Sequence, residues 1–315
     1  MIWTMKISVI IPVFNAEKYI ARAGESALQQ NEVDEVIFID DGSSDNSINI
    51  CNSFHENNNK VKVIKHPDGL NHGAGASRNL GIKEAKCEYI AFLDADDFYC
   101  ENRFLQTSQI FMKNPDIDGV YEVLGVSYNS ERSKNQHIDR MKQIKQLYHN
   151  PTIPLEYTGM EPNIPPKELF KEMIVGKKGW VHLNTLTLKK ASIDNFQLFS
   201  SLNLGEDSEF IFRLAHEKIL LSSNNVRPVA VRNVHRNNRI PYSGYHQLLW
   251  EYMFNYFLKR RFDKTISRVI VRNYLNNYSK NYYNCSNSIL REAWKLWNFF
   301  TLSIKYPRMI HYLLS

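Results

Sequence analysis

The chain has 315 residues, of which 43% are hydrophobic and 12% aromatic. That is enough apolar chain for one large domain or two modest ones, and it excludes a disordered protein. The formal net charge of +6 is uneven, because residues 245–315 hold 11 Lys and Arg against 3 Asp and Glu, whereas residues 1–244 hold 28 against 30. The basic character therefore belongs to the C-terminal tail.

Neither the N-terminus nor the cysteines indicate export. The apolar run over residues 7–13 is too short to span a bilayer, and we expect neither a signal peptide nor a transmembrane helix. The four cysteines are scattered without zinc-binding spacing, at Cys51, Cys87, Cys100 and Cys285. We expect reduced thiols in a cytoplasmic protein.

Short strands and helices alternate in the first 100 residues. The apolar patterns predict strands over 6–12, 35–39, 61–65 and 89–93, and helices over 17–30, from Ser43 or Ser44 onward, and over 75–85. This alternation favours an α/β fold with a doubly wound, mainly parallel sheet, in which ligands bind beyond the carboxyl ends of the strands. Polar residues follow three of these ends, at Asn15, at Asp40 and Asp41, and at Asp94 to Asp97.

Three carboxylates, those of Asp94, Asp96 and Asp97, follow a predicted buried strand. Crowded carboxylates repel one another unless a cation lies between them. Mg²⁺ and Mn²⁺ favour one or two carboxylates together with phosphate oxygens, so the pattern predicts a divalent metal and a phosphorylated ligand. The alternative is a solvated turn in which Asp96 or Asp97 caps a helix over 99–112.

Small residues and Arg78 in the segment 71–81 suit a diphosphate at a helix N-terminus, although a surface loop with an ion-paired arginine is the alternative. The proline-rich segment 129–168 is predicted to be a partly irregular insertion near the cleft, either a lid or acceptor site or simply disordered.

The second half of the chain adds two polar sites. Glu206 and Asp207 open a predicted helix, a position that the helix dipole favours in any protein. Strands are predicted over 183–188 and 226–234, and His235 directly follows the second of them. We expect His235 either to bind a metal or phosphate or to be structural.

The tail is basic and aromatic, with helices predicted over 248–262 and 288–300. Such helices can lie on an anionic membrane surface, cap the α/β domain, or pair with a second copy of the chain as a homodimer. Binding of nucleic acid is not expected, because no known reader motif accompanies the charge.

Five motifs in the same order resemble the family 2 glycosyltransferases of GT-A fold. They occur at residues 8–15, 39–45, 78–81, 92–97 and 205–207. The resemblance covers about residues 5–220 and implies inverting transfer of a sugar from a UDP-sugar to an acceptor hydroxyl.

The resemblance also implies roles for single residues. Asp41 would bind the uracil, Phe14 would lie near the base, and Glu17 would approach the ribose. Asp96, with Asp94 and in some relatives a residue like His235, would bind Mn²⁺ or Mg²⁺. Asp207 would be the catalytic base, with Glu206 as second choice. The full set implied to contact the nucleotide sugar is Pro12, Phe14, Asn15, Glu17, Asp41, Arg78, Asp94 and Ala95.

The QxxRW segment and membrane helices of the family's processive synthases are missing, which favours a single addition. We expect a catalytic domain over 1–240 and a helical tail over 241–315. Surface polysaccharide or a lipid-linked carbohydrate is the expected acceptor class, and the inner membrane face is the expected location of any peripheral binding. Two alternatives remain: a sugar-phosphate nucleotidyltransferase, which should carry a glycine-rich basic loop after the first strand, and an inactive sugar-nucleotide-binding protein of the same fold.

Overall fold

The computed structural model describes residues 4–148, 157–235, 238, 245–258, 260, 264–282 and 300. The chain forms two compact units, one of residues 1–203 and 210–238, and one of residues 204–209 and 239–315. Each unit is described by itself.

A seven-stranded sheet forms the centre of the first unit. Its strand order is β10-β6-β9-β4-β1-β2-β3, and only β9 runs antiparallel to its neighbours. The strands are β1 (Ile7–Val13), β2 (Val33–Asp40), β3 (Val61–Lys65), β4 (Tyr89–Phe92), β6 (Gly119–Tyr121), β9 (Leu186–Lys189) and β10 (Leu220–Ser222). The predicted mainly parallel α/β sheet is confirmed.

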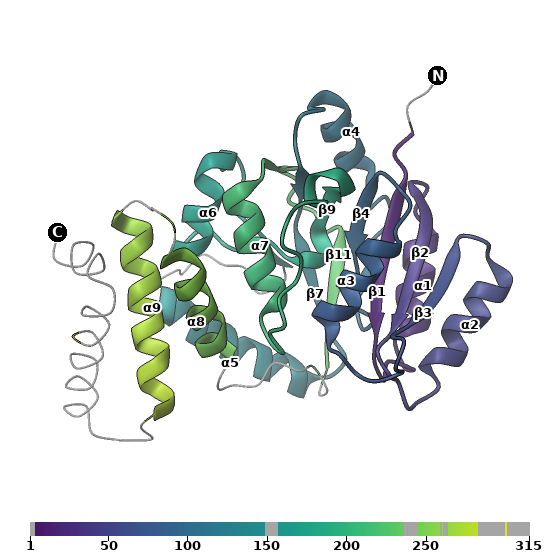
Figure 1. Ribbon diagram of the computed structural model, residues 1–315, viewed down its shortest axis with the longest axis horizontal. Coiled ribbons are helices and arrows are strands. Elements are labelled where there is room, and N and C mark those ends of the chain that lie inside the picture. The colour runs from purple at the N-terminus through teal and green to yellow at the C-terminus, as the bar shows by residue number, and fades with distance from the viewer. Residues whose placement is uncertain are drawn as a thin grey trace. The chain divides into compact units, whose positions relative to one another are not determined.

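Helices cover both faces of this sheet. A Cβ on Gly81 of α3 (Ala74–Glu84) would lie 2.4 Å from Ile10, whereas one on Gly24 of α1 (Ile20–Leu28) would lie 2.8 Å from Phe38. Ile10 pairs with Ile37, the neighbour of Phe38, so these two contacts are on opposite faces. α3 therefore lies on one face, in front of β1 in Figure 1, and α1 lies on the other beside α2 (Ser47–Asn57).

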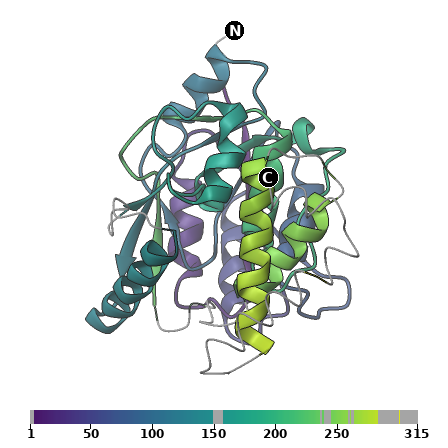
Figure 2. The same ribbon diagram turned by 90° about the vertical axis from the view of Figure 1, so that its left-hand side faces the viewer.

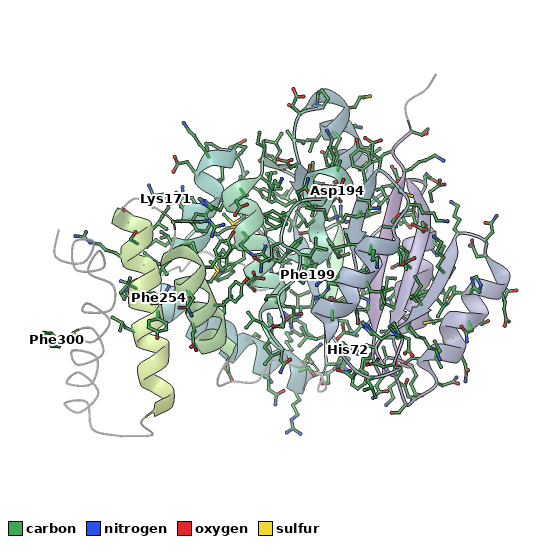
Figure 3. The ribbon with its side chains drawn as sticks, viewed as in Figure 1. His72, Lys171, Asp194, Phe199, Phe254 and Phe300 are labelled. Atoms are coloured by element: carbon green, nitrogen blue, oxygen red, sulfur yellow. The ribbon has the colours of Figure 1, made fainter. Side chains whose placement is uncertain are left out.

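The core lies between the sheet and these helices. Apolar residues of β1 and β2 are fully buried, and Phe38 packs on Phe54 of α2. On the α3 side, Phe199 stacks on Phe210 of α7 (Glu206–Glu217), with ring centroids 4.1 Å apart, and Figure 3 shows it among closely packed side chains. The backbone of Phe199 exchanges two hydrogen bonds of 2.9 Å with the side chain of Asn79, which ties this segment to α3.

A second, four-stranded sheet has the order β5-β11-β7-β8. Its strands are β5 (Phe98–Tyr99), β7 (Leu124–Tyr128), β8 (Tyr157–Thr158) and β11 (Ala230–Val234). β5 pairs antiparallel with β11, which brings the segment after β4 next to a segment about 130 residues later in the chain. The predicted helix over 99–112 is wrong at its start, because this pairing holds residues 98–99 extended and α4 (Leu105–Lys113) begins only afterwards.

Other predicted boundaries also shift. The insertion predicted over 129–168 is helical at its start, because α5 (Glu131–Tyr148) covers its first half. This helix projects from the end of β7, at the lower left of Figure 2. The strand predicted over 183–188 begins as a 3-10 turn, η1 (Leu183–Thr185), and a second such turn, η2 (Lys190–Ile193), follows β9. The strand predicted over 226–234 is confined to β11. α6 (Pro166–Val175) starts at a proline, whose fixed φ suits the first turn of a helix.

The second unit contains α8 (Tyr245–Leu258) and α9 (Lys264–Tyr282), which pack side by side. Phe254 and Tyr274 stack between them with ring centroids 4.3 Å apart. The helix predicted over 288–300 lies outside the described residues, apart from residue 300. No helix in the described part of the chain combines the length and apolar character that crossing a membrane requires.

Candidate functional site

Of the three carboxylates after β4, two are half-buried and one is fully buried. The turn that carries them is closed by a hydrogen bond from the backbone N–H of Asp97 to the carbonyl oxygen of Asp94, at 3.0 Å. The side chains of Asp94 and Asp96 are 39% and 31% exposed, whereas Asp97 is buried. Only Asp94 and Asp96 can therefore meet a ligand directly.

Asp97 instead anchors the turn. One carboxylate oxygen accepts a hydrogen bond from the Asn184 side-chain amide at 2.5 Å, and the other accepts the backbone N–H of Asn233 in β11 at 2.8 Å. Asn184 also accepts the N–H of Asp94 at 3.1 Å. Burial raises the pKa of Asp97 well above its usual range, and the charges of Asp96 and Asp94 add to that shift.

The structure brings Asp96 and His235 together across 139 residues of sequence. His235 Nε2 lies 3.0 Å from Asp96 Oδ2, and the side-chain amide of Asn238 donates to the same oxygen at 3.0 Å. The backbone N–H of His235 donates to Asn238 Oδ1 at 2.5 Å, which closes a small polar ring. The predicted strand-end histidine thus lies at the acidic turn.

A carboxylate oxygen and an imidazole nitrogen so close together suit a divalent metal as two of its ligands, with phosphate and water completing the set. Within the described ranges, no group of three or more His, Cys, Asp or Glu side chains is close enough to hold a metal ion without other ligands.

Tyr19 packs flat on His235. The two rings are stacked with centroids 4.4 Å apart and planes 18° apart. Burial, with the nearby charge of Asp96, raises the pKa of the Tyr19 hydroxyl, so this ring stays neutral near pH 7. Sequence analysis did not single out Tyr19, because nothing local distinguishes it from an aromatic residue at the start of a helix.

Arg78 pairs with Asp94. Its guanidinium donates to Asp94 Oδ1 at 2.7 Å, and its own side chain is only 5% exposed. The guanidinium carbon also lies 5.4 Å from the centre of the Phe199 ring. The alternative of a surface-loop arginine is therefore wrong, since Arg78 is buried in α3 and directed at the acidic turn.

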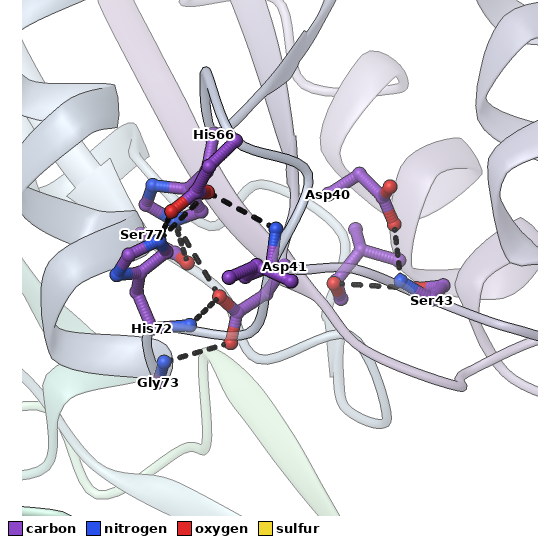
Figure 4. Close-up of polar contacts among 10 residues, drawn as sticks. Asp40, Asp41, Ser43, His66, His72, Gly73 and Ser77 are labelled. Atoms are coloured by element: carbon purple, nitrogen blue, oxygen red, sulfur yellow. Dashed lines mark hydrogen bonds and ion pairs between the residues drawn. The ribbon is translucent and has the colours of Figure 1, made fainter.

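The second cluster surrounds Asp41, directly after β2, and Figure 4 shows it. Asp41 is 1% exposed, and its two oxygens accept the backbone N–H groups of His72 at 2.7 Å and Gly73 at 3.0 Å, just before α3 begins. His66 Nε2 lies 3.4 Å from Asp41 Oδ1 and 3.0 Å from the hydroxyl oxygen of Ser77. Asp41 thus fastens the loop before α3 to the carboxyl end of β2.

His66 is a second residue that the sequence analysis missed, although a signal was present. It directly follows β3, as Asp41 follows β2, and the carboxyl ends of parallel strands carry ligand sites.

The loops after β1 and β2 hold one another through polar contacts. Asn15, with φ of 49°, accepts the backbone N–H of Ser44 at 2.8 Å, and its own N–H donates to the hydroxyl of Ser43 at 3.2 Å. Glu17 accepts the N–H of Asn46 at 3.1 Å. Between them Phe14 is 37% exposed, the only large apolar side chain of this loop that faces solvent, while Pro12 is buried in β1 and Ala95 in the acidic turn.

Glu206 and Asp207 open α7 and belong to the second unit. Asp207 is half-buried, and one of its oxygens accepts the backbone N–H of Ser208 at 2.6 Å. The predicted role of Asp207 as a base stays a prediction.

Comparison with known proteins gives one family. The family model described as "Glycosyl transferase family 2" matches residues 8–164. The chain is 38% identical over 130 residues to "Glycosyltransferase GlyG" of Streptococcus pneumoniae serotype 4, and this match covers 40% of each protein. It is 36% identical over 134 residues to "Minor teichoic acid biosynthesis protein GgaA" of Bacillus subtilis, covering 40% of this chain and 28% of that protein. These matches span less than half the length of either relative.

Among solved structures, S. aureus TarS 1-349 in complex with UDP-GlcNAc superposes with a TM-score of 0.60. The superposition covers 88% of this chain and 73% of TarS 1-349, with 20% sequence identity. At this identity the likeness concerns the fold, which is the GT-A arrangement of a mainly parallel sheet between helices.

Proposed function

The chain belongs to glycosyltransferase family 2, and from this premise we propose that it transfers one sugar from a UDP-sugar to an acceptor hydroxyl, with inversion at the sugar carbon. The observation that carries the proposal is the pairing of Asp96 with His235, 3.0 Å apart, beside the Arg78 and Asp94 pair at the carboxyl end of β4. This arrangement suits a nucleoside diphosphate that arrives with a cation, because one side offers metal ligands and the other a buried guanidinium.

The nucleoside would bind beside β1 and β2. Phe14 offers an exposed aromatic face for the base, and the Asp41 cluster lies at the end of the neighbouring strand. Each oxygen of Asp41 already accepts one backbone N–H, so contact with uracil would use a remaining lone pair of one oxygen or would act through the loop that Asp41 holds. The UDP-bearing TarS structure of the same fold supports uridine as the base.

We propose Mn²⁺ or Mg²⁺ as the cofactor, held by Asp96 and His235 and approached by Asp94. When bound, such a cation neutralises charge on a leaving diphosphate. Arg78 supplies a second, permanent positive charge in the same place. Its pairing with Asp94 keeps the guanidinium oriented until a phosphate competes for it.

Asp207 is proposed as the general base, with Glu206 as the second choice. Its carboxylate takes the proton of the acceptor hydroxyl, the acceptor oxygen forms a bond to the sugar carbon, and the bond from that carbon to the phosphate oxygen breaks. The electron pair leaves with the nucleoside diphosphate. A single displacement of this kind inverts the configuration.

For the acceptor we propose a carbohydrate of surface polysaccharide or a lipid-linked saccharide, since a relative is named for teichoic acid biosynthesis. The basic second unit would hold the enzyme to an anionic membrane face or, alternatively, join a second copy of the chain. A sugar-phosphate nucleotidyltransferase is the less favoured function, because the loop after β1 lacks a glycine-rich basic sequence. An inactive sugar-nucleotide-binding protein is disfavoured because Asp41, Asp94, Asp96 and Asp207 are all present.

Calorimetric titration of the full chain with UDP, GDP and a panel of UDP-sugars, each with and without Mn²⁺, tests the proposal. We expect Mn²⁺-dependent binding of UDP and of one UDP-sugar, and loss of the Mn²⁺ dependence in Asp96→Asn. Binding of GDP in preference to UDP would contradict the donor class. A folded protein that binds none of these ligands would contradict the enzymatic function.

A further inference from the structure

Asn184 faces the acidic turn because of the way in which β9 pairs with β4. The two strands are antiparallel, with Ala91 of β4 opposite Thr187 of β9. Continuing this register past the carboxyl end of β4 places Asp94 opposite Asn184, the middle residue of η1. Asn184 is only 4% exposed. Its side-chain amide therefore meets neighbouring groups of the protein rather than solvent.

The amide of Asn184 is a link in a chain of three hydrogen bonds. Its Oδ1 accepts the backbone N–H of Asp94 at 3.1 Å, and its Nδ2 donates to Asp97 Oδ2 at 2.5 Å. The other oxygen of Asp97 accepts the backbone N–H of Asn233 at 2.8 Å. The chain thus begins and ends at a backbone N–H, with one amide and one carboxylate between these ends.

Few pairs of side chains can complete such a chain. Because a backbone N–H stands at each end, the two side chains between them must together present three acceptors and one donor. One amide and one carboxylate do so in either order, whereas two amides leave two N–H groups facing each other. A buried polar group without a partner is costly, so the turn after β4 would have to move to relieve that contact.

We infer that Asn184 is a positioning residue, which holds the turn after β4 in the conformation that presents Asp94 and Asp96 to the nucleotide and its cation. The inference rests on the proposed function and adds a residue to it. Asn184 acts through its hydrogen bonds rather than by contact with a ligand, since it is buried. Because Asn233 precedes His235 by two residues, the same chain of hydrogen bonds also fixes the end of β11 beside the turn.

The test exchanges the two side chains in the full chain and measures the affinity for UDP by calorimetry, with and without Mn²⁺. Asp97→Asn puts two amides in the chain of hydrogen bonds and should weaken UDP binding in Mn²⁺ roughly 10- to 100-fold, the usual effect of losing a partner behind a metal ligand. Adding Asn184→Asp to it restores one amide and one carboxylate in reverse order, which should return the affinity to within about threefold of the unchanged protein. Asn184→Leu removes both hydrogen bonds at similar volume and should be as weak as Asp97→Asn. Asn59→Asp, at an exposed position before β3, is the matched control and should bind normally.

The affinity without Mn²⁺ separates positioning from a general loss of structure. The nucleoside would bind beside β1 and β2, so the weaker UDP binding without Mn²⁺ should stay nearly unchanged in Asp97→Asn and in Asn184→Leu. An equal loss with and without Mn²⁺ would overturn the inference, as would an exchanged pair that binds no better than Asp97→Asn. Circular dichroism of each variant verifies folding. If both single variants unfold, the exchanged pair decides: it should fold and bind, and an exchanged pair that unfolds as well would overturn the inference.

The two proposals fail in different ways. If Mn²⁺ does not raise the UDP affinity of the unchanged protein, the metal-dependent function fails and the inference fails with it. If Mn²⁺ raises the UDP affinity of the unchanged protein and of Asn184→Leu by the same factor, the inference alone is overturned.

Discussion

Asp97 illustrates how a carboxylate can serve a site without facing its ligand. It is buried behind Asp94 and Asp96, and its two oxygens join the turn after β4 to Asn184 and to the backbone of Asn233 in β11. Asn233 precedes His235 by two residues, so this buried anchor sets the distance between Asp96 and His235. In the proposed site, Asp94 and Asp96 are therefore the residues accessible to a ligand, and Asp97 anchors the turn that carries them.

Asp207→Asn tests the proposed base. An amide cannot accept the acceptor's proton, so we expect turnover to fall on the order of a hundredfold or more, while affinity for UDP with Mn²⁺ stays nearly unchanged. Steady-state kinetics with the donor identified by calorimetry measure the first quantity, and UDP titration measures the second. Glu206→Gln is the matched variant beside it. Should Asp207→Asn keep most of its turnover and Glu206→Gln lose it, Glu206 would be the base.

At the scale of elements, one carboxylate ties the amino ends of three strands together. Glu35 of β2 accepts hydrogen bonds from Ser8 of β1 at 2.5 Å, from the Lys62 ammonium of β3, and from the backbone N–H of Lys86, just after α3, at 2.9 Å. Burial opposes ionisation of Glu35, but these donors outweigh it and leave its pKa below the usual 4.5. These contacts lie at the amino ends of the strands, whereas the proposed site lies at the carboxyl ends.

The lowered pKa predicts an acid-dependent stability. The folded protein favours ionised Glu35, so its contribution is complete above the unfolded-state pKa of about 4.5 and is lost as the pH falls through the lower folded-state value. Glu35→Gln should lower the free energy of unfolding at pH 7 by about 1–3 kcal/mol and flatten its decline below pH 5. Urea denaturation followed by circular dichroism between pH 3 and 7 measures both effects.

Asp34→Asn is the control for this experiment. Asp34 precedes Glu35 and pairs with Lys6 on the surface, where both side chains are exposed. Because exposed pairs add little to stability, this variant should follow the unchanged protein. An equal effect of both substitutions would mean that surface charge, rather than the buried contacts of Glu35, governs the acid dependence.

At the scale of the whole molecule, charge and catalytic motifs occupy different parts of the chain. The family match ends at residue 164, whereas the excess of Lys and Arg begins near residue 245. In α9 no acidic residue occurs, and Arg268 and Arg272 are four residues apart, so these two arginines form a basic stripe on one face of the helix. Arg268 and Arg272 are exposed, while Ile266 and Ile270 are buried.

This stripe predicts binding to an anionic surface. Replacing both Arg268 and Arg272 by Gln should weaken binding to vesicles containing anionic lipid by about fivefold for each charge, since one basic residue near such a surface contributes about 1 kcal/mol. Co-sedimentation at low and high salt measures it, and salt should reduce the difference. Lys83→Gln with Lys113→Gln removes the same charge from exposed positions of the first unit. If both pairs lower binding equally, net charge and not α9 is responsible.

The sequence by itself determined the fold class, the family and the places where chemistry could occur. Alternating apolar runs are a local property, so the four strands from β1 to β4 and the helices between them appear within a few residues of their predicted positions. Because the polar residues directly follow these strands, the gathering of Asn15, Asp41 and Asp94 at one edge of the sheet also followed from the sequence. Such runs predict strands and helices well because both the apolar pattern and the element that it predicts depend on the same neighbouring residues.

Only the tertiary structure decided which groups meet. The contact of Asp96 with His235, the stacking of Tyr19 on that histidine, and the pairing of residues 98–99 with β11 all join segments more than 100 residues apart. No local pattern encodes such contacts, since they depend on how the two sheets assemble. The predicted helix from residue 99 is wrong for the same reason, because strand pairing with a distant segment overrides local helix preference.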